Sequence, residues 1–385
     1  MLSRIRTLDA LQQPDWDDAE ALDRARAELS ALPALVRRGD VLRLRTLLAG
    51  AAAGTALVLQ AGDCAEDPAD CFTGGALRKA GLVDMLGGIM QMNTHLPVVR
   101  VGRIAGQFAK PRSRPVETVG GRELPVYRGH IVNAPEPDPA LRRADPQRLV
   151  SGYQAARQAV RDLGWAPDTA PHPVPQPWTS HEALVLDYEL PQVRDEGDGA
   201  LLASTHWPWI GERTRGLDQA HVDLLSRVVN PVACKVGPKA TEDEVVALCG
   251  RLDPGRDPGR LTLIARMGAD AVGERLPRLV AAARAAGHPV VWLCDPMHGN
   301  TVTTGDGYKT RVLDRIVREV EGFVAAVRDG GGVPGGLHLE TTPDEVTECA
   351  DGADRMDTVS AKYTSLCDPR LNPRQALRVV DSWKS

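Results

Sequence analysis

Lysine is scarce in this chain of 385 residues, which holds seven lysines against 39 arginines. Arginine therefore serves as the ordinary solubilising cation, so a lysine kept beside a predicted strand is more informative than usual. Four of the seven lie in glycine- or proline-punctuated segments beside other polar residues: Lys110, Lys235, Lys239 and Lys309. Chance placement is the alternative explanation for each of them.

Basic blocks and long apolar runs are also absent from the sequence. The net charge is −5 and the pI is about 6.0, which argues against nucleic-acid and anionic-membrane partners. No apolar run approaches the roughly 18 residues of a membrane span, and residues 1–14 lack the apolar core of a signal peptide. We therefore expect a cytoplasmic protein with neither a nucleic-acid nor a membrane partner.

The cysteines do not form a recognisable framework. There are seven, an odd number, and they are scattered and never arranged as CxxC. This pattern indicates neither a disulfide framework nor a zinc-ribbon site. Reduced thiols, one of them a metal ligand, are the better expectation.

The order of apolar patterns predicts a two-part organisation. Residues 1–54 carry helical periodicity and predict an N-terminal helical extension that packs but has no chemistry. Residues 55–385 predict a catalytic domain, interrupted by a proline-rich excursion at about 134–179 that contains one helix at 145–163. The 43% hydrophobic content is enough for a large core.

Eight apolar, β-branched runs predict buried strands. They lie at residues 55–60, 97–104, 201–205, 230–237, 261–268, 289–294, 335–340 and 363–367. Helices are predicted between them, including those at 75–92, at 180–188 with Ser180 as N-cap, from 342 onward, and at 373–383.

This alternation predicts an α/β fold, a (β/α)₈ TIM barrel, with a doubly wound sheet as the alternative. Residues 330–335 formally satisfy GxGxxG. They precede a strand and contain Pro334, however, so they do not indicate a dinucleotide site.

Barrel enzymes build their active sites at the carboxyl ends of the strands. Four side chains that follow strands there form a candidate divalent-metal site: Cys64, His298, Glu340 and Asp368. Their oxygens favour manganese or iron(II), whereas the thiolate and imidazole also suit cobalt and zinc. The alternative is an inert buried thiol and carboxylates that merely pair with arginines.

Two groups of polar and cationic residues also follow these strands. One consists of Arg103, Arg213, Lys235 and Arg266, and the other of Lys110, Arg112, Ser113, Lys309 and Arg311. So much positive charge exceeds what one carboxylate requires. This positive charge favours a site where two phosphorylated substrates meet beside a Lewis acid.

Several long motifs run through the chain: QAGDCAE (60–66), VGRIAGQFAKPRS (101–113), HEALVLDYE (181–189), WIGERTRGLDQAHV (209–222), NPVACKVGP (230–238), CDPMHGN (294–300), GYKTR (307–311), HLETTPDEVTEC (338–349) and CDPRLN (367–372). With these motifs the chain resembles the type II 3-deoxy-D-arabino-heptulosonate 7-phosphate (DAHP) synthases. The resemblance implies a (β/α)₈ barrel that joins phosphoenolpyruvate to D-erythrose 4-phosphate, the first step of the shikimate pathway. A homo-oligomer, dimer or tetramer, is also expected.

The resemblance assigns roles residue by residue. It implies Cys64, His298, Glu340 and Asp368 as metal ligands, with Mn²⁺ or Co²⁺ expected and Zn²⁺ also suitable. The implied phosphoenolpyruvate contacts are Arg103, Glu212, Arg213, Lys235 and Arg266. The implied aldose-phosphate contacts are Lys110, Arg112, Ser113, Lys309 and Arg311. Lys110, Glu212 and Lys235 are the expected catalytic residues, and either Glu212 or a metal-bound water takes the proton of the water that adds.

Two departures from the family pattern stand out. Ala61 replaces a usual second glycine in the metal loop, and the proline-rich region occupies the place where long members carry extra helices used for feedback. The short form resembles enzymes that supply secondary metabolism, including phenazine biosynthesis. Alternatives are an aminoDAHP synthase acting on an amino-substituted aldose phosphate, a barrel metallohydrolase, and a catalytically silent, partner-binding homologue.

Overall fold

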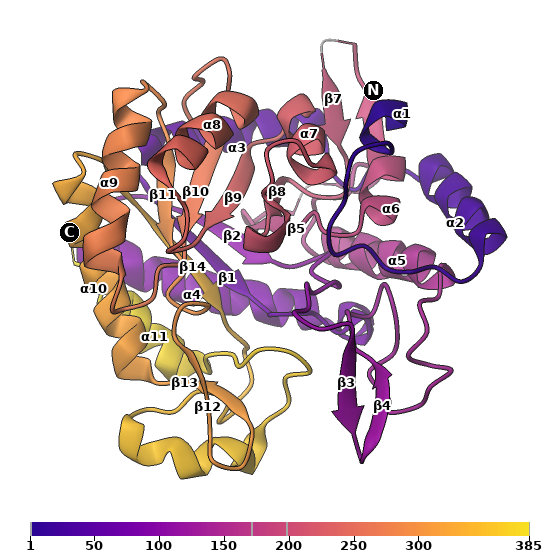
Figure 1. Cartoon of the computed structure of the whole chain (residues 1–385). Helices are drawn as coiled ribbons and strands as arrows, with labels where there is room; N and C mark the ends of the chain where they lie inside the picture. Colours follow the sequence, from indigo (N-terminus) through magenta and orange to yellow (C-terminus); the bar gives the residue numbers. More distant parts are fainter. Residues whose placement is uncertain (1, 171, 198, 385) are drawn as a thin grey trace.

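Eight parallel strands close into a barrel in the computed structural model, which describes residues 2–170, 172–197 and 199–384 (Figure 1). The strands are β1 (Leu57–Gly62), β2 (Val98–Arg103), β5 (Trp178–Glu182), β8 (Trp207–Ile210), β9 (Val232–Val236), β10 (Leu261–Ala265), β11 (Val291–Cys294) and β14 (Pro334–Glu340). Each barrel strand pairs with the barrel strands before and after it along the chain, and β14 pairs with β1. The predicted (β/α)₈ barrel is confirmed.

Helices surround the barrel, and short hairpins interrupt the connections. The helices are α1 (Leu2–Ile5), α2 (Ala19–Ala31), α3 (Arg38–Ala52), α4 (Gly75–Thr94), α5 (Gln147–Asp162), α6 (Leu186–Glu189), α7 (Ala220–Arg227), α8 (Glu242–Leu252), α9 (Val272–Ala285), α10 (Leu313–Asp329) and α11 (Pro373–Asp381). Short 3₁₀ turns are η1 (Pro68–Phe72), η2 (Leu190–Gln192), η3 (Glu212–Thr214) and η4 (Ala353–Lys362). The hairpins are β3–β4 (Val116–Val119 and Arg122–Pro125), β6–β7 (Val193–Asp195 and Ala200–Leu202) and β12–β13 (Thr301–Thr303 and Lys309–Arg311). Among the described residues, no helix is long and apolar enough to cross a membrane.

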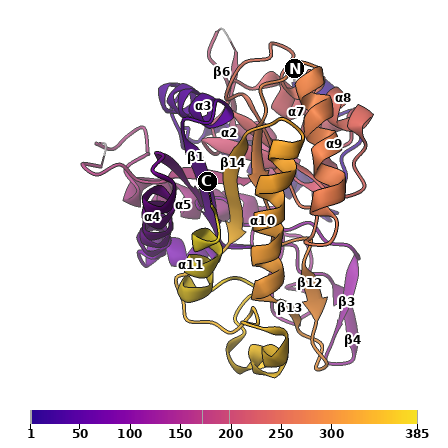
Figure 2. The same cartoon turned by 90° about the vertical axis from the view of Figure 1, so that its left-hand side faces the viewer.

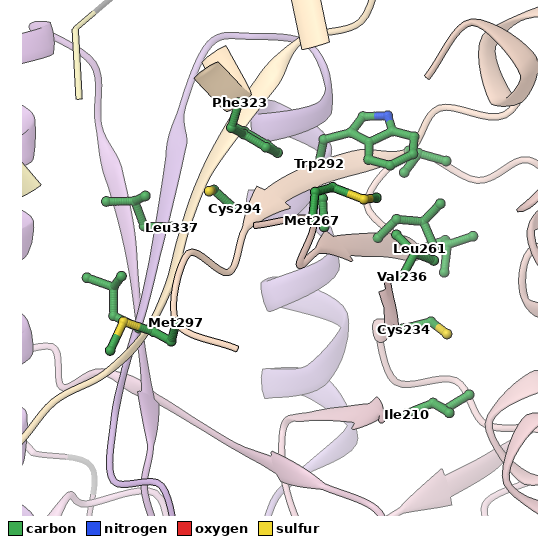
Figure 3. Packing of buried hydrophobic residues seen from close by; sticks show 14 of the residues in the cluster. Ile210, Cys234, Val236, Leu261, Met267, Trp292, Cys294, Met297, Phe323 and Leu337 are labelled. Atoms are coloured by element: carbon green, nitrogen blue, oxygen red, sulfur yellow. The ribbon is translucent and has the colours of Figure 1, made fainter. Parts of the chain in front are cut away.

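Alternate side chains of the barrel strands build two apolar layers. Trp292 and Cys294 of β11 belong to the outer layer, together with Phe323 of α10 (Figure 3). Val291 and Leu293 of the same strand belong to the inner cluster. The period of two therefore places one set of side chains against the helices and the other inside the barrel.

Helix α3 closes one end of the barrel. Its residues Leu44, Leu48 and Ala51 are fully buried in the inner cluster with Val58 and Val291. In both views α3 lies away from hairpins β3–β4 and β12–β13, which project from the opposite end (Figures 1 and 2). The amino ends of the strands are thus covered, and the carboxyl ends carry the long loops. The domain boundary expected at residue 54 falls between α3 and β1 and remains a prediction.

The helix predicted at residues 180–188 is wrong, because residues 178–182 form barrel strand β5. The polar side chains of β5 do not give the apolar pattern from which a buried strand is predicted. Ser180 Oγ donates to the Gly102 carbonyl at 2.8 Å, and His181 Nε2 contacts Glu189 Oε1 at 2.8 Å. Side-chain hydrogen bonds therefore replace the apolar character expected of a buried strand.

The barrel strand predicted at residues 201–205 is also wrong. Ala200–Leu202 is strand β7 of an antiparallel hairpin with β6, and the barrel strand is β8, which follows it. Pro208 lacks the amide proton that residues of a central strand normally donate. The WPWI sequence of β8 therefore does not predict a central strand. In the structure His181 of β5 aligns with Pro208, and the strands on both sides pair around it.

The eighth predicted strand and the helix before it are wrong as well. Residues 363–367, all of which the structure describes, form no strand, and the described residues 342–345 begin no helix. The carboxylate of Glu348 accepts the backbone N–H groups of Thr364 and Ser365. A buried side chain, rather than a neighbouring strand, satisfies this backbone. The helices predicted at 145–163 and 373–383 are confirmed by α5 and α11.

We predict that Leu44→Ala or Leu48→Ala lowers the free energy of unfolding by about 2–5 kcal/mol, because each removes a fully buried side chain from the barrel floor. Leu47→Ala is the matched control, since Leu47 is 38% exposed on the same helix. Thermal and urea unfolding followed by circular dichroism measure the difference. Equal effects of the three changes would contradict the packing of α3 into the barrel.

Candidate active site

A cavity of about 580 Å³ opens at the carboxyl ends of the barrel strands. Most of the predicted site residues line it: Arg103, Lys110, Arg112, Ser113, Glu212, Arg213, Lys235, Arg266, His298, Lys309 and Asp368. Hairpin β3–β4 contributes a further wall through Val116, Glu117 and Thr118. Cys64 and Glu340 are fully buried and contact the cavity-lining Lys110.

Three of the four predicted metal ligands converge behind this cavity. The ligand atoms of Cys64, Glu340 and Asp368 all lie within 4.8 Å of one another. The fourth, His298, places Nε2 3.2 Å from Glu340 Oε1. Cys64 follows β1, Glu340 ends β14, His298 follows β11 and Asp368 lies in the loop before α11. The fold therefore brings them together from distant parts of the sequence.

The ammonium of Lys110 lies among the same ligand atoms. Its Nζ is 2.7 Å from Cys64 Sγ, 3.2 Å from Glu340 Oε1 and 2.9 Å from Asp368 Oδ2. Burial would lower the pKa of Lys110, but Asp368, Cys64 and Glu340 raise it well above its usual value. The convergence point of the ligands is therefore a position that favours positive charge.

Glu340 is the central anion of the site. Arg103 Nη2 reaches its Oε1 at 3.0 Å, and Arg311 Nη2 reaches its Oε2 at 2.8 Å. Burial would raise the pKa of Glu340, but His298, Lys110 and the two arginines hold it well below its usual value. The group is thus a carboxylate, ready to bind a cation.

The Cys64 thiol provides a test of whether these residues suit a metal. Burial, a hydrogen bond with Cys367 and the charge of Glu340 raise its pKa well above the usual value. A thiolate there requires additional positive charge, which a divalent cation supplies on binding. One sulfur, one imidazole and two carboxylates are a donor set that such an ion accepts.

A second buried carboxylate orients His298. Asp295 Oδ2 lies 2.8 Å from His298 Nδ1 and 2.8 Å from Lys235 Nζ. Burial would raise the pKa of Asp295, but His298 and Lys235 hold it well below its usual value. With Nδ1 bound to Asp295, the Nε2 atom faces the cluster, as in carboxylate–histidine–metal arrangements.

Lys235 stands beside this carboxylate at the end of β9 and lines the cavity. Burial lowers its pKa although Asp295 opposes the change, and Arg103 lowers the pKa further. Arg266 reaches the His298 carbonyl with Nη2 at 3.3 Å. Lys235 and Arg266, two of the cations predicted to bind phosphoenolpyruvate, therefore lie near His298 and line the same cavity.

Arg103 is held by a chain of neutral groups inside the barrel. Its Nη1 contacts His338 Nε2 at 2.7 Å, and His338 Nδ1 lies 2.6 Å from Gln60 Oε1. Burial, Lys235 and Arg103 keep the pKa of His338 well below its usual value. The neutral imidazole accepts from Arg103 at Nε2 and donates to Gln60 from Nδ1. Gln60 in turn donates to Ser180 Oγ.

The residues predicted to bind the aldose phosphate also line the cavity, apart from Arg311. Arg112 Nη2 pairs with Glu117 of β3 at 3.2 Å, and Lys309 Nζ pairs with Asp368 Oδ1 at 3.0 Å. Ser113 Oγ accepts from Arg213 Nη2 at 2.8 Å, which joins the two predicted groups. Both groups thus face one continuous space.

Arg311 is placed differently from the other predicted substrate residues. It is fully buried and is not among the described residues that line the cavity. Its Nη2 binds Glu340, its Nη1 binds the Pro369 carbonyl, and its Nε lies 3.2 Å from Thr301 Oγ1. The side chain therefore anchors Glu340 from behind.

Sequence reasoning missed Glu182 and Gln12. Glu182 lines the cavity at the end of β5, and its Oε1 has no hydrogen-bond partner among the described residues. Glu182 belongs to the HEALVLDYE motif, for which the sequence pattern predicts a helix, not a strand that ends at the cavity. Gln12, in the extension expected to carry no chemistry, accepts the Arg112 backbone N–H at 2.8 Å. No local pattern connects residues so far apart in the sequence.

Oxidation should inhibit the protein through Cys64 and Cys367. The two thiols lie in one buried cluster, and Asp368 N lies 3.3 Å from Cys64 Sγ. We predict that peroxide forms a Cys64–Cys367 disulfide and removes a metal ligand, detectable by peptide mass spectrometry. Cys367→Ser protein should resist inactivation, whereas Cys71→Ser should not. Another pairing, or unchanged sensitivity of Cys367→Ser, would contradict this.

Comparison with known proteins identifies relatives along the whole chain. The sequence model of the class-II DAHP synthetase family matches residues 1–166 and 167–382. A Pseudomonas fluorescens protein described as a probable phospho-2-dehydro-3-deoxyheptonate aldolase is 55% identical over 388 residues, covering 100% of this chain and 97% of the relative. The phospho-2-dehydro-3-deoxyheptonate aldolase of Streptomyces coelicolor is 40% identical over 423 residues, covering 97% and 94%.

A solved structure shares the fold. It is a phospho-2-dehydro-3-deoxyheptonate aldolase from Francisella tularensis, with a TM-score of 0.55 and 13% sequence identity, and the superposition covers 97% of each chain.

Proposed function

Because this chain belongs to the class-II DAHP synthetase family, we propose that it is a 3-deoxy-7-phosphoheptulonate synthase that condenses phosphoenolpyruvate with D-erythrose 4-phosphate. The observation that supports this is one cavity of about 580 Å³, which several arginine and lysine side chains line beside a cluster of groups that could hold a metal. One joined space is what a reaction between two phosphorylated substrates requires.

We assign Cys64, His298, Glu340 and Asp368 as the residues that hold a divalent cation, Mn²⁺ or Co²⁺, with Zn²⁺ also compatible with this donor set. When bound, the ion supplies Lewis acidity that polarises the aldehyde oxygen of erythrose 4-phosphate. Arg311 and Arg103 keep Glu340 ionised and oriented for this role.

Phosphoenolpyruvate is assigned to the side that carries Arg103, Arg213, Lys235 and Arg266. Arginine and lysine side chains give charge-assisted hydrogen bonds to carboxylate and phosphate oxygens. Burial lowers the pKa of Lys235. An anion that binds beside Lys235 therefore stabilises the charged form of its ammonium group. Erythrose 4-phosphate is assigned to Arg112, Ser113 and Lys309, with its aldehyde towards the metal ligands.

The reaction then proceeds by carbon–carbon bond formation. C3 of phosphoenolpyruvate attacks the aldehyde carbon, and Lys110, which lies among the ligand groups, gives a proton to the hydroxyl that forms. Positive charge develops at C2, water adds there, and Glu212 accepts its proton. Glu212 Oε2 is buried and without a hydrogen-bond partner among the described residues. Cleavage of the C2–O bond then releases inorganic phosphate and leaves the ketone of DAHP.

We further propose that the product feeds secondary metabolism of the phenazine type. The alignment with the Streptomyces relative spans 423 positions, more than the 385 residues of this chain, whereas that with the Pseudomonas relative spans 388. The two segments matched by the family model meet at 166/167, inside the proline-rich region. Both findings support a short form.

We also propose that the enzyme acts in the cytoplasm and forms a homo-oligomer. Both substrates are phosphorylated anions that do not cross lipid bilayers unaided, which supports a cytoplasmic site of action. A homo-oligomer, dimer or tetramer, is supported by the outer face of α4, where Leu77, Met85 and Met92 are 45%, 44% and 65% exposed.

Metal dependence is tested by Cys64→Ser. We predict a loss of activity greater than about 100-fold, since even outer partners of metal ligands are worth about 10–100-fold. Phosphate release from phosphoenolpyruvate with erythrose 4-phosphate and metal content are measured on the same protein, before and after chelation and Mn²⁺ addition. Cys249→Ser is the matched control. Full activity after exhaustive chelation would contradict the metal assignment.

The assignment of two substrate sides is tested by Lys235→Ala, Arg266→Ala and Arg112→Ala. The first two should raise the Michaelis constant for phosphoenolpyruvate, and the third that for erythrose 4-phosphate. Each change removes charge-assisted hydrogen bonds of about 1.5–3 kcal/mol, or roughly ten- to hundred-fold. Arg122→Ala, on the exposed strand β4, controls for net charge. Equal increases in both constants for all three variants would refute the assignment.

A further inference from the structure

The loop at residues 364–370, which carries Asp368, is wound around one buried carboxylate. Glu348 is fully buried, and its Oε1 accepts Thr364 N at 3.1 Å and Ser365 N at 2.8 Å. Its Oε2 accepts Arg370 N at 2.7 Å. Both ends of the loop therefore converge on Glu348, and Asp368 lies between them.

The Arg370 side chain closes the same arrangement. Its Nε and Nη2 form a two-point contact with Glu348 at 3.1 and 2.7 Å. Its Nη1 donates to Asp63 Oδ1 at 2.7 Å, and Asp63 directly precedes Cys64. Glu348 thus connects, through Arg370, the loops that carry Cys64 and Asp368.

Within the loop, Ser365 transmits this restraint to Asp368. Ser365 Oγ donates to the Asp368 carbonyl at 2.7 Å and accepts Cys367 N at 3.2 Å. Asp368 N then meets Cys64 Sγ at 3.3 Å. The backbone around Asp368 is fixed on one side by Ser365 and on the other by Cys64.

We propose that Glu348 is a positioning residue for the metal site. It is not among the described residues that line the cavity, and it acts by setting the separation of Cys64 and Asp368. A divalent cation accepts only a narrow range of ligand distances, so a looser loop weakens its binding. This inference rests on the proposed metal site of the synthase.

The test is Glu348→Gln with Glu345→Gln as the matched control. The amide keeps the size of the carboxylate, but its NH₂ group faces either the Thr364 and Ser365 amides or that of Arg370, and both are donors. Glu345 is exposed on the same segment, so its change alters net charge equally. Co²⁺ is titrated into each full-length protein, and the thiolate-to-cobalt charge-transfer absorption reports binding at Cys64 without any turnover.

We expect Glu348→Gln to weaken Co²⁺ binding by about 10–100-fold, the usual effect of losing an outer partner of a metal ligand, while Glu345→Gln binds as the unmodified protein does. Circular dichroism shows whether each variant is folded. Equal Co²⁺ affinity in folded Glu348→Gln protein would overturn the proposal. Absence of the absorption band in the unmodified protein would instead overturn the metal site itself.

Ser365→Ala provides the same test should Glu348→Gln not fold. This change removes only the Oγ contacts to Asp368 and Cys367, on a half-exposed residue. A weaker cobalt affinity in the folded variant supports the restraint of Asp368 by its loop. An affinity equal to that of the unmodified protein overturns it.

Discussion

Burial of the Glu340 carboxylate is the constraint on which the site depends. The side chain is fully buried at the end of β14, where an unpaired charge would be prohibitively costly. Arg103, Lys110 and Arg311 surround it, and they come from β2, the loop after β2 and β13. Lys110 also pairs with Asp368, and Arg311 lies behind Glu340 and is not among the described residues that line the cavity. The cations that do line the cavity favour phosphorylated anions, and the converging carboxylates and thiol form the candidate metal site.

Much of the barrel could be predicted because most of its strands are continuous apolar runs. β9, β10 and β11 contain few polar residues, and their ends display the residues that line the cavity. Strand β5 was not predicted because hydrogen bonds of Ser180 and His181 replace the apolar burial of an ordinary barrel strand. Strand β8 was not predicted because Pro208 lies where a central strand normally has an amide donor. Local patterns carry no information about partners contributed by remote segments.

The candidate metal ligands were accessible to sequence reasoning for a related reason. Cys64, His298 and Glu340 lie at the carboxyl ends of the neighbouring strands β1, β11 and β14, and such side chains become neighbours whatever the loops contain. Asp368 was predicted from a strand that does not form, and the loop before α11 brings it to the same place. The burial of Arg311 behind Glu340 and the contact of Gln12 with Arg112 depend instead on loop paths. Buried carboxylates direct several of those paths. Glu66 accepts the amides of Gly106 and Gln107, and Glu319 accepts those of Met267 and Gly268. Such pairings are invisible until the fold is known.

The barrel floor formed by α3 has a consequence for how the chain is made. Leu44 and Leu48 leave the ribosome early, but their partners Val291 and Leu293 are synthesised only in the last third of the chain. At about 5–20 residues per second, synthesis reaches Val291 and Leu293 on the order of tens of seconds after α3. The barrel floor can therefore be completed only after the second half of the chain has been synthesised.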